Sequence, residues 1–222
     1  MSKKPTLTAT AEAPVADISL AIAIISLTTE CRGRAMPCSA PISHHLALYR
    51  YWLAKRAGRA MPARSDIDPA EIPPLLPYLA IVDKVDGQFR YRLVGTVVAL
   101  ELGRDLTGSY VGSHVKLPEH AAAQRALFKR VFTTARPILT EGQYLTTSGA
   151  IHNVSRLMLP LADDGATVNM VFFTRIACFS PGARARSDWL KHITGNISDV
   201  VEVTDAVKLE KRCLEWERKC PE

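Results

Sequence analysis

The stretch that decides the fold is LAIVDKVDGQFRYRLVG, residues 79–95. It holds two runs rich in apolar residues, separated by Asp86-Gly87. An Asp-Gly pair between such runs is a strong short-range signal for a two-residue hairpin, because both turn positions need positive φ angles. In the second run apolar residues alternate with Arg90 and Arg92, which is the period of a strand with one face on a core. The stretch therefore predicts two antiparallel strands, at residues 79–85 and 88–94.

The residues after this hairpin predict two helices and three further strands. The expected helices lie at residues 96–102 and 119–135, and the expected strands at residues 138–146, 151–161 and 167–176. Pro118 and Pro137 bound the longer helix, and the turn sequences Ser148-Gly149 and 163–165 (DDG) link the strands. This order of elements predicts an α+β fold with an antiparallel sheet.

The last of these strands carries apolar residues on both faces. Val171 and Phe173 share one face, yet Met170 and Phe172 on the other face are also apolar. A sheet face open to water does not need such residues, so we expect both faces to be covered. The expected cover for Val171 and Phe173 is an amphipathic helix at residues 44–59.

That helix precedes a segment that is dense in proline. Tyr49, Trp52 and Leu53 belong to its apolar stripe, so Trp52 is expected to pack against the sheet. Residues 61–78 contain five prolines and predict turns, with one helical turn at residues 69–72.

The composition is that of a globular protein with its basic charge at one end. Of 222 residues 47% are apolar and 23% are charged, which argues against a disordered or fibrous chain. The formal net charge is +6, and residues 1–64 hold nine basic and three acidic residues. The whole excess lies there, which excludes the body-wide basicity of a chromatin-type binder.

The chain divides into three expected parts. Residues 1–40 are expected to be a disordered appendage, residues 41–180 the domain with its flanking helix, and residues 181–222 a helical tail. The apolar run at residues 15–27 is interrupted by Asp17 and is shorter than the roughly 20 residues that span a bilayer. The five cysteines have no CxxC spacing, so free thiols in the cytoplasm are expected.

Four linked motifs lie between residues 44 and 176. They are PARSDIDP at 62–69, LP at 76–77, FRYRLVGT at 89–96 and GRDLTG at 103–108. Together with the preceding Trp-containing helix and the order of elements, they resemble a bacterial family of PAS-domain proteins. The resemblance implies a five-stranded antiparallel sheet in the order 2-1-5-4-3. It also implies a sensory or regulatory module for signal transduction, which binds a small ligand or a signalling protein between the sheet and its short helices.

A ligand pocket of this kind would be lined by apolar side chains of the strands and the long helix. The candidates are Tyr91, Leu93, Phe128, Phe132, Leu157, Leu159, Met170 and Phe172. The same residues would also serve as a plain core, and both readings stay open.

The resemblance leaves the cofactor unknown. A flavin photosensor needs a reactive cysteine, and there is none between Cys38 and Cys178, so flavin photochemistry is disfavoured. Haem is also unfavoured, because His120 begins the long helix at a polar turn, where a surface or capping role is expected, as for His114. No metal site is expected.

Catalysis is not expected either. The motifs GxSxG, HExxH, Walker A and GxGxxG are absent from the sequence, as are histidine-kinase and cyclase signatures. Without a recognisable output domain, the output is expected to be another protein or a homodimer formed through the flanking helices.

An alternative function involves the basic side of the first helix. Arg50, Lys55, Arg56 and Arg59 would neutralise phosphates of nucleic acid or of an anionic membrane. The competing interpretation is a solvated face on a structural helix. The sequence identifies neither the ligand nor the partner.

Overall fold

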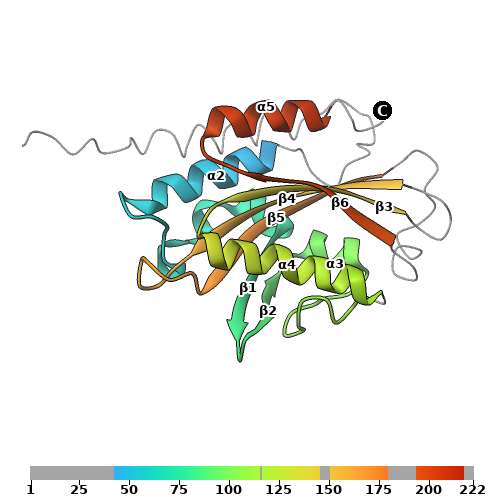
Figure 1. Ribbon diagram of the computed structural model, residues 1–222. Coiled ribbons are helices and arrows are strands. Elements are labelled where there is room, and N and C mark those ends of the chain that lie inside the picture. Colours follow the sequence, from blue (N-terminus) through green and yellow to red (C-terminus); the bar gives the residue numbers. More distant parts are fainter. Residues whose placement is uncertain (1–42, 116, 146–150, 180–193, 218–222) are drawn as a thin grey trace, which may run out of the picture.

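The computed structural model describes residues 43–115, 117–145, 151–179 and 194–217. In these ranges the chain has an α+β fold, in which helices cover both faces of one antiparallel sheet (Figure 1). The elements in chain order are α2 (Ser43–Arg56), the short 3₁₀ helices η1 (Arg64–Asp66), η2 (Pro69–Glu71) and η3 (Pro73–Tyr78), β1 (Leu79–Val85), β2 (Gln88–Val94), α3 (Thr96–Leu102), α4 (Pro118–Thr134), β3 (Ile138–Leu145), β4 (Ile151–Leu161), β5 (Met170–Phe179), β6 (Thr194–Glu202) and α5 (Ala206–Glu217).

The sheet has the strand order β2-β1-β5-β4-β3-β6. Its first five strands follow the expected order 2-1-5-4-3, and β6 adds a sixth strand beside β3. The hairpin between β1 and β2 turns at Asp86 and Gly87, whose φ angles are 49° and 78°. Positive values at both positions are what a two-residue turn requires, so the hairpin prediction is confirmed.

The C-terminal segment differs from the helical tail that we expected. Residues Thr194–Glu202 form β6, and only Ala206–Glu217 is helical. The sequence between 197 and 203 (ISDVVEV) is rich in β-branched residues, which favour extended backbone. Because β3 offers a free edge to pair with, this strand preference prevails over the irregular helical spacing.

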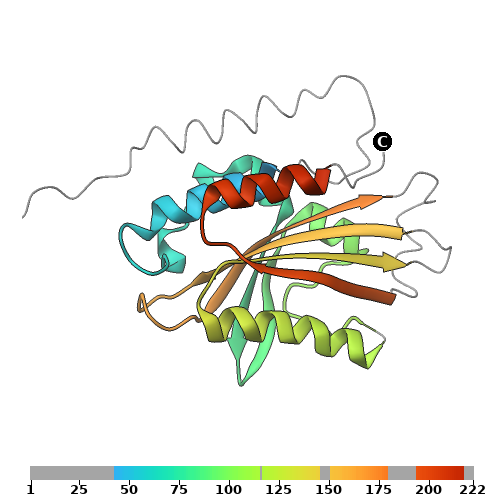
Figure 2. The same cartoon turned by 45° about the horizontal axis from the view of Figure 1, so that its top comes forward.

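Each face of the sheet has its own hydrophobic cluster. On one face α2 and α5 pack together with the Pro-rich segment, over side chains that include Leu157, Leu159 and Phe172. On the other face α4 covers a cluster that includes Met158 and Phe173. Figures 1 and 2 show α2 and α5 on one side of the strands, and α3 and α4 on the other.

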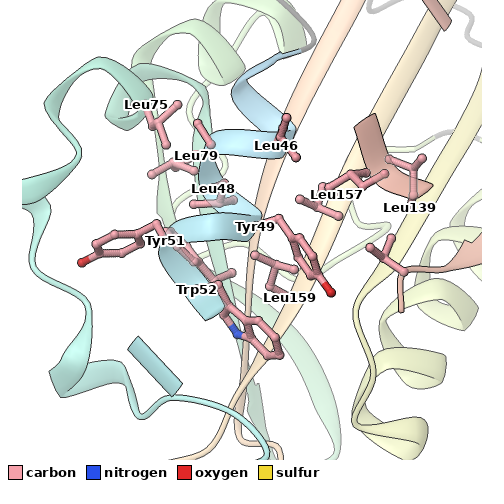
Figure 3. Close-up of a cluster of buried hydrophobic side chains, with 14 of the residues drawn as sticks. Leu46, Leu48, Tyr49, Tyr51, Trp52, Leu75, Leu79, Leu139, Leu157 and Leu159 are labelled. Atoms are coloured by element: carbon pink, nitrogen blue, oxygen red, sulfur yellow. The ribbon is translucent and has the colours of Figure 1, made fainter. Parts of the chain in front are cut away.

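Helix α2 is fastened to the sheet by polar as well as apolar contacts. His45 Nδ1 lies 2.6 Å from Thr174 Oγ1, and His45 Nε2 lies 3.0 Å from Ser155 Oγ. Trp52 Nε1 donates a hydrogen bond of 2.8 Å to the carbonyl oxygen of Pro160. Figure 3 shows the aromatic side chains of α2 among leucines of the sheet and of η3.

Two expectations about α2 are corrected. Trp52 is buried, but in the cluster of Phe172, whereas Val171 and Phe173 lie beneath α4 on the opposite face. Alternation along a strand separates its two faces but does not say which helix covers which. The helix is also not amphipathic, because eight of its 14 residues are buried and α5 packs against it.

Two helices close the other face. Helix α3 begins after Gly95 and ends at Gly103, which adopts the left-handed conformation with φ 70°. Helix α4 has Pro118 as its first residue and buries Leu127, Phe128 and Val131, as its spacing predicts. Within the described ranges, no helix combines the length and the apolar character that crossing a membrane requires.

Candidate functional site

A small chamber lies between the sheet and the helices α3 and α4. Its volume is about 30 Å³, and its walls come from β2, β4, β5, both helices and the loop before α4. The lining residues are Tyr91, Val98, Leu102, His114, Gln124, Leu127, Phe128, Arg156, Met158, Phe173 and Arg175. The lining residues that the structure describes are mostly apolar and include two arginines but no carboxylate, so an anion is the charge type that they favour.

An ion pair is buried at the chamber wall. The guanidinium of Arg175 on β5 contacts the carboxylate of Glu101 on α3, and the two side chains are only 5% and 3% exposed. Burial lowers the pKa of Arg175 to about 10, because the charged form loses hydration. Arg175 therefore stays cationic at neutral pH. The pair ties the short helix α3 to the centre of the sheet.

His114 and Gln124 bring further polar atoms into the same chamber. His114 packs edge-on against the ring of Tyr91, with 6.2 Å between the ring centroids. Burial, together with repulsion from Arg104 and Arg156, lowers the pKa of His114 to about 4, so the ring is neutral at pH 7. His114 Nδ1 and Gln124 Oε1 are buried and have no hydrogen-bond partner among the described residues. Buried polar atoms without a hydrogen-bond partner are rare in folded proteins, and their presence here fits a site for a polar ligand.

A second and larger cavity lies on the opposite face of the sheet. This groove has a volume of about 520 Å³ and runs between the Pro-rich segment and the strands β1 and β2. Ile67, Ile72 and Leu76 form one wall, and Ile81 and Phe172 belong to the strands. Its lining contains one charged residue, Arg64.

The expected pocket residues do not come together in one cavity. Tyr91 and Phe128 line the chamber, whereas Leu93 and Phe172 line the groove. Leu157 and Leu159 are fully buried in the cluster beneath α2. Met170 is partly buried against that same cluster, and Phe132 contacts both clusters. The set therefore combines residues of two sheet faces.

The basic residues of α2 and of the turn that follows it at Arg59 are mostly engaged in local contacts, and the helix ends at Arg56, three residues before the expected end. Lys55 Nζ lies 2.6 Å from Glu71 Oε2, and Arg59 Nη2 lies 2.6 Å from Asp66 Oδ2. Arg56 stacks on the ring of Trp52 at 5.2 Å and donates to the carbonyl oxygen of Arg59. The acids come from the Pro-rich segment, so the excess positive charge of this region is partly compensated in the fold. Arg50 is half-buried.

A buried contact between Ser155 and His45 lies beneath α2, away from both cavities. His45 and Ser155 are 0% and 1% exposed and line neither cavity, so this contact anchors α2 and offers no nucleophile to a substrate. Burial lowers the pKa of His45 to about 3, so the ring is neutral.

The two described cysteines differ in their chemical state. Cys213 carries a buried thiol, as expected, whereas Cys178 is disulfide-bonded, which corrects the expectation of a free thiol at that residue.

Sequence reasoning missed the polar half of the chamber. His114 was expected at the surface, and Glu101 was not among the residues that the sequence singled out. The available signal was a lone charge within an apolar element: Arg175 in MVFFTRIACF and Glu101 in TVVALEL. A charged residue in such surroundings is seldom buried unless it is paired, so each predicts a partner elsewhere in the fold.

Comparisons with known proteins agree with this architecture. A family model described as "PAS domain" matches residues 42–173, which is more than half of the 222 residues. A search of curated proteins finds no match. The matched range starts at α2 and ends within β5, so it covers the chamber except for Arg175, and the groove completely. By this match, the chain belongs to the PAS-domain family.

Proposed function

We propose that this protein is a sensory PAS module for a small anionic molecule, which enters the chamber and replaces Glu101 at Arg175. Membership of the PAS family suggests a sensory or regulatory role. The observation that carries the ligand proposal is the buried Arg175–Glu101 pair at the wall of a chamber lined by arginines.

The electrostatics of Arg175 favour an anion over a neutral ligand. A guest that pushed Glu101 away without supplying a charge would leave the buried guanidinium without its carboxylate, and breaking a buried ion pair in this way costs about 3 to 5 kcal/mol. An anion avoids that cost because it forms the same kind of pair. Arg156 adds a second positive charge, whereas His114 is neutral.

The wall that yields to the guest is α3. The chamber of about 30 Å³ has room for roughly one water-sized group, so a larger guest must displace part of its lining. Helix α3 has only seven residues, Leu100 on its outer side is 55% exposed, and Glu101 ties it to the sheet. Exchange of the anion at Arg175 would therefore release α3, and the displaced helix is the proposed signal.

The signal would pass to a protein partner or a second copy of the chain, and the module itself is proposed not to be an enzyme. The described chamber lining has no Ser, Cys, Asp or Glu side chain that would serve as a nucleophile. Nucleic-acid or anionic-membrane binding through α2 has less support, because Lys55 and Arg59 already face Glu71 and Asp66.

Chemical rescue tests the proposal. Glu101→Ala removes the carboxylate from the buried pair with Arg175 and opens space beside it, so the melting temperature should fall by on the order of 10 °C. Acetate should raise the melting temperature of this variant well above its effect on the wild type, because it supplies a carboxylate that binds only the folded state. Acetamide, which has nearly the same shape but no charge, should not do so at matched ionic strength.

Two matched variants serve as controls. Glu119→Ala removes an exposed carboxylate from the first turn of α4 and should melt close to the wild type, with no specific response to acetate. The double variant Glu101→Leu/Arg175→Met removes both charges and should also lose the response. An equal response to acetate and acetamide, or none in Glu101→Ala, would contradict anion recognition at Arg175.

A further inference from the structure

The groove on the α2 side is a second cavity, separated from the chamber by the sheet. Its volume of about 520 Å³ lies within the range of roughly 300 to 1,000 Å³ that is typical of small-molecule sites. Leu76 and Leu93 both belong to its lining and are 37% and 43% exposed, so the groove presents large apolar side chains to solvent. The cavity therefore offers apolar surface to a guest without any rearrangement of the fold.

The positive charge of Arg64 in the groove determines which head group of a ligand would fit. Among the described residues of the lining, Arg64 alone is charged, and its Nη1 donates a hydrogen bond of 3.0 Å to the carbonyl oxygen of Ile67. This bond fixes the guanidinium at the rim and engages one of its five N–H groups. The remaining lining is apolar except for Thr96. A long apolar surface with one cation complements an alkyl chain with one carboxylate.

We propose that the groove binds a free single-chain fatty acid, whose carboxylate pairs with Arg64 and whose alkyl chain lies between Leu76 and Leu93. This site is independent of the chamber, because the two cavities share no lining residue. They do share helix α3: Thr96 lines the groove, whereas Val98 and Leu102 line the chamber. A bound fatty acid would therefore contact the element that closes the other site.

Close packing sets the shape of the groove. Gly95 follows β2 against the backbone of η3, and a Cβ atom there would overlap the carbonyl oxygens of Leu76 and Pro77. Glycine is needed here for close approach, because its φ of −66° is open to every residue. The contact places the Pro-rich wall close to the residue that precedes α3.

Calorimetric titration of the full chain with hexanoate, octanoate and decanoate tests the site. Affinity should rise roughly three- to fourfold with each added methylene, because each one buries apolar surface. Decanol, which lacks the charge, should bind about tenfold more weakly than decanoate. Arg64→Gln should remove the preference for decanoate over decanol while decanol still binds.

Two further variants locate the binding. Leu93→Asp places a carboxylate in the groove at a half-exposed position and should abolish decanoate binding, with a melting temperature near that of the wild type. Arg92→Gln is the matched control, because Arg92 neighbours Leu93 on β2, is 55% exposed and lies outside the groove lining. Decanoate affinity that is unchanged in Arg64→Gln and Leu93→Asp would overturn the proposal. So would a dimer, seen by sedimentation, that buries the groove and excludes decanoate.

Discussion

His114 faces the chamber as a neutral side chain, and this makes stability depend on pH. Its pKa is about 4 in the folded protein and about 6.5 in the unfolded chain. Between these values the unfolded chain binds more protons, so the free energy of unfolding falls as pH decreases from about 6.5 towards 4. Relative to a His114→Gln variant, the wild type should lose about 1 kcal/mol on going from about pH 7.5 to about pH 5.5. Urea unfolding at both pH values measures this difference.

His45 does not disturb that comparison, because the wild type and the His114→Gln variant both retain it. Its pKa is about 3, so it contributes a pH dependence of the same sign to each protein. Parallel curves for the two proteins would mean that the pKa of His114 is the same in the folded and the unfolded chain, which would contradict its lowered pKa.

The sequence was least informative about which cavity or cluster each single residue belongs to. Tyr91 and Phe128 lie on one face of the sheet, whereas Leu157 and Leu159 belong to the opposite face. The bulge between Ile81 and Val82 shifts the pairing of β1 with β2, and alternation in a single strand contains no information on such a shift. Buried pairs such as Arg175 with Glu101 depend on residues far apart in sequence, so only the fold brings them together.

At the scale of elements, α5 is part of the core on the α2 side. Leu209, Cys213 and Trp216 are buried in that cluster, whereas Leu214 on the same helix is 52% exposed. Trp216→Ala should lower the free energy of unfolding by about 3 to 5 kcal/mol, because a large buried side chain is lost. Leu214→Ala is the matched control and should change it by no more than about 0.5 kcal/mol.

Chemical denaturation of the whole chain measures both variants of α5. A loss in Trp216→Ala no larger than that in Leu214→Ala would mean that α5 is detached from the domain in solution. A single cooperative transition at lower denaturant would show that α5 unfolds together with the sheet.

Most elements were predictable because their signals are local. The strands at 79–85, 88–94 and 151–161 and the helix at 96–102 have the expected bounds, set by Asp86-Gly87, Gly95 and Gly103. β6 was missed because its pairing with β3 joins segments more than 45 residues apart. Residues 197–203 are a short run rich in β-branched residues, which favours a strand, but the spacing of the surrounding segment favours a helix. Only the free edge of β3 decides between the two structures.

At the scale of the whole molecule, α3 is the element on which both cavities meet. It is short, it borders the chamber and the groove, and Glu101 ties it to β5. Local opening of such an element costs less than global unfolding, since it exposes little core. The proposed sensor therefore uses a small movable helix on an otherwise rigid sheet, and its state depends on which carboxylate Arg175 holds.

Hydrogen exchange of the α3 amides in Glu101→Ala, with and without acetate, tests this account most directly. Acetate should restore the melting temperature, because Arg175 regains a partner. The amides of α3 should nevertheless continue to exchange faster than in the wild type, because acetate is not attached to the helix. Restored protection of α3 together with restored stability, or no effect of acetate on either, would contradict the exchange of anions at Arg175 as the signal.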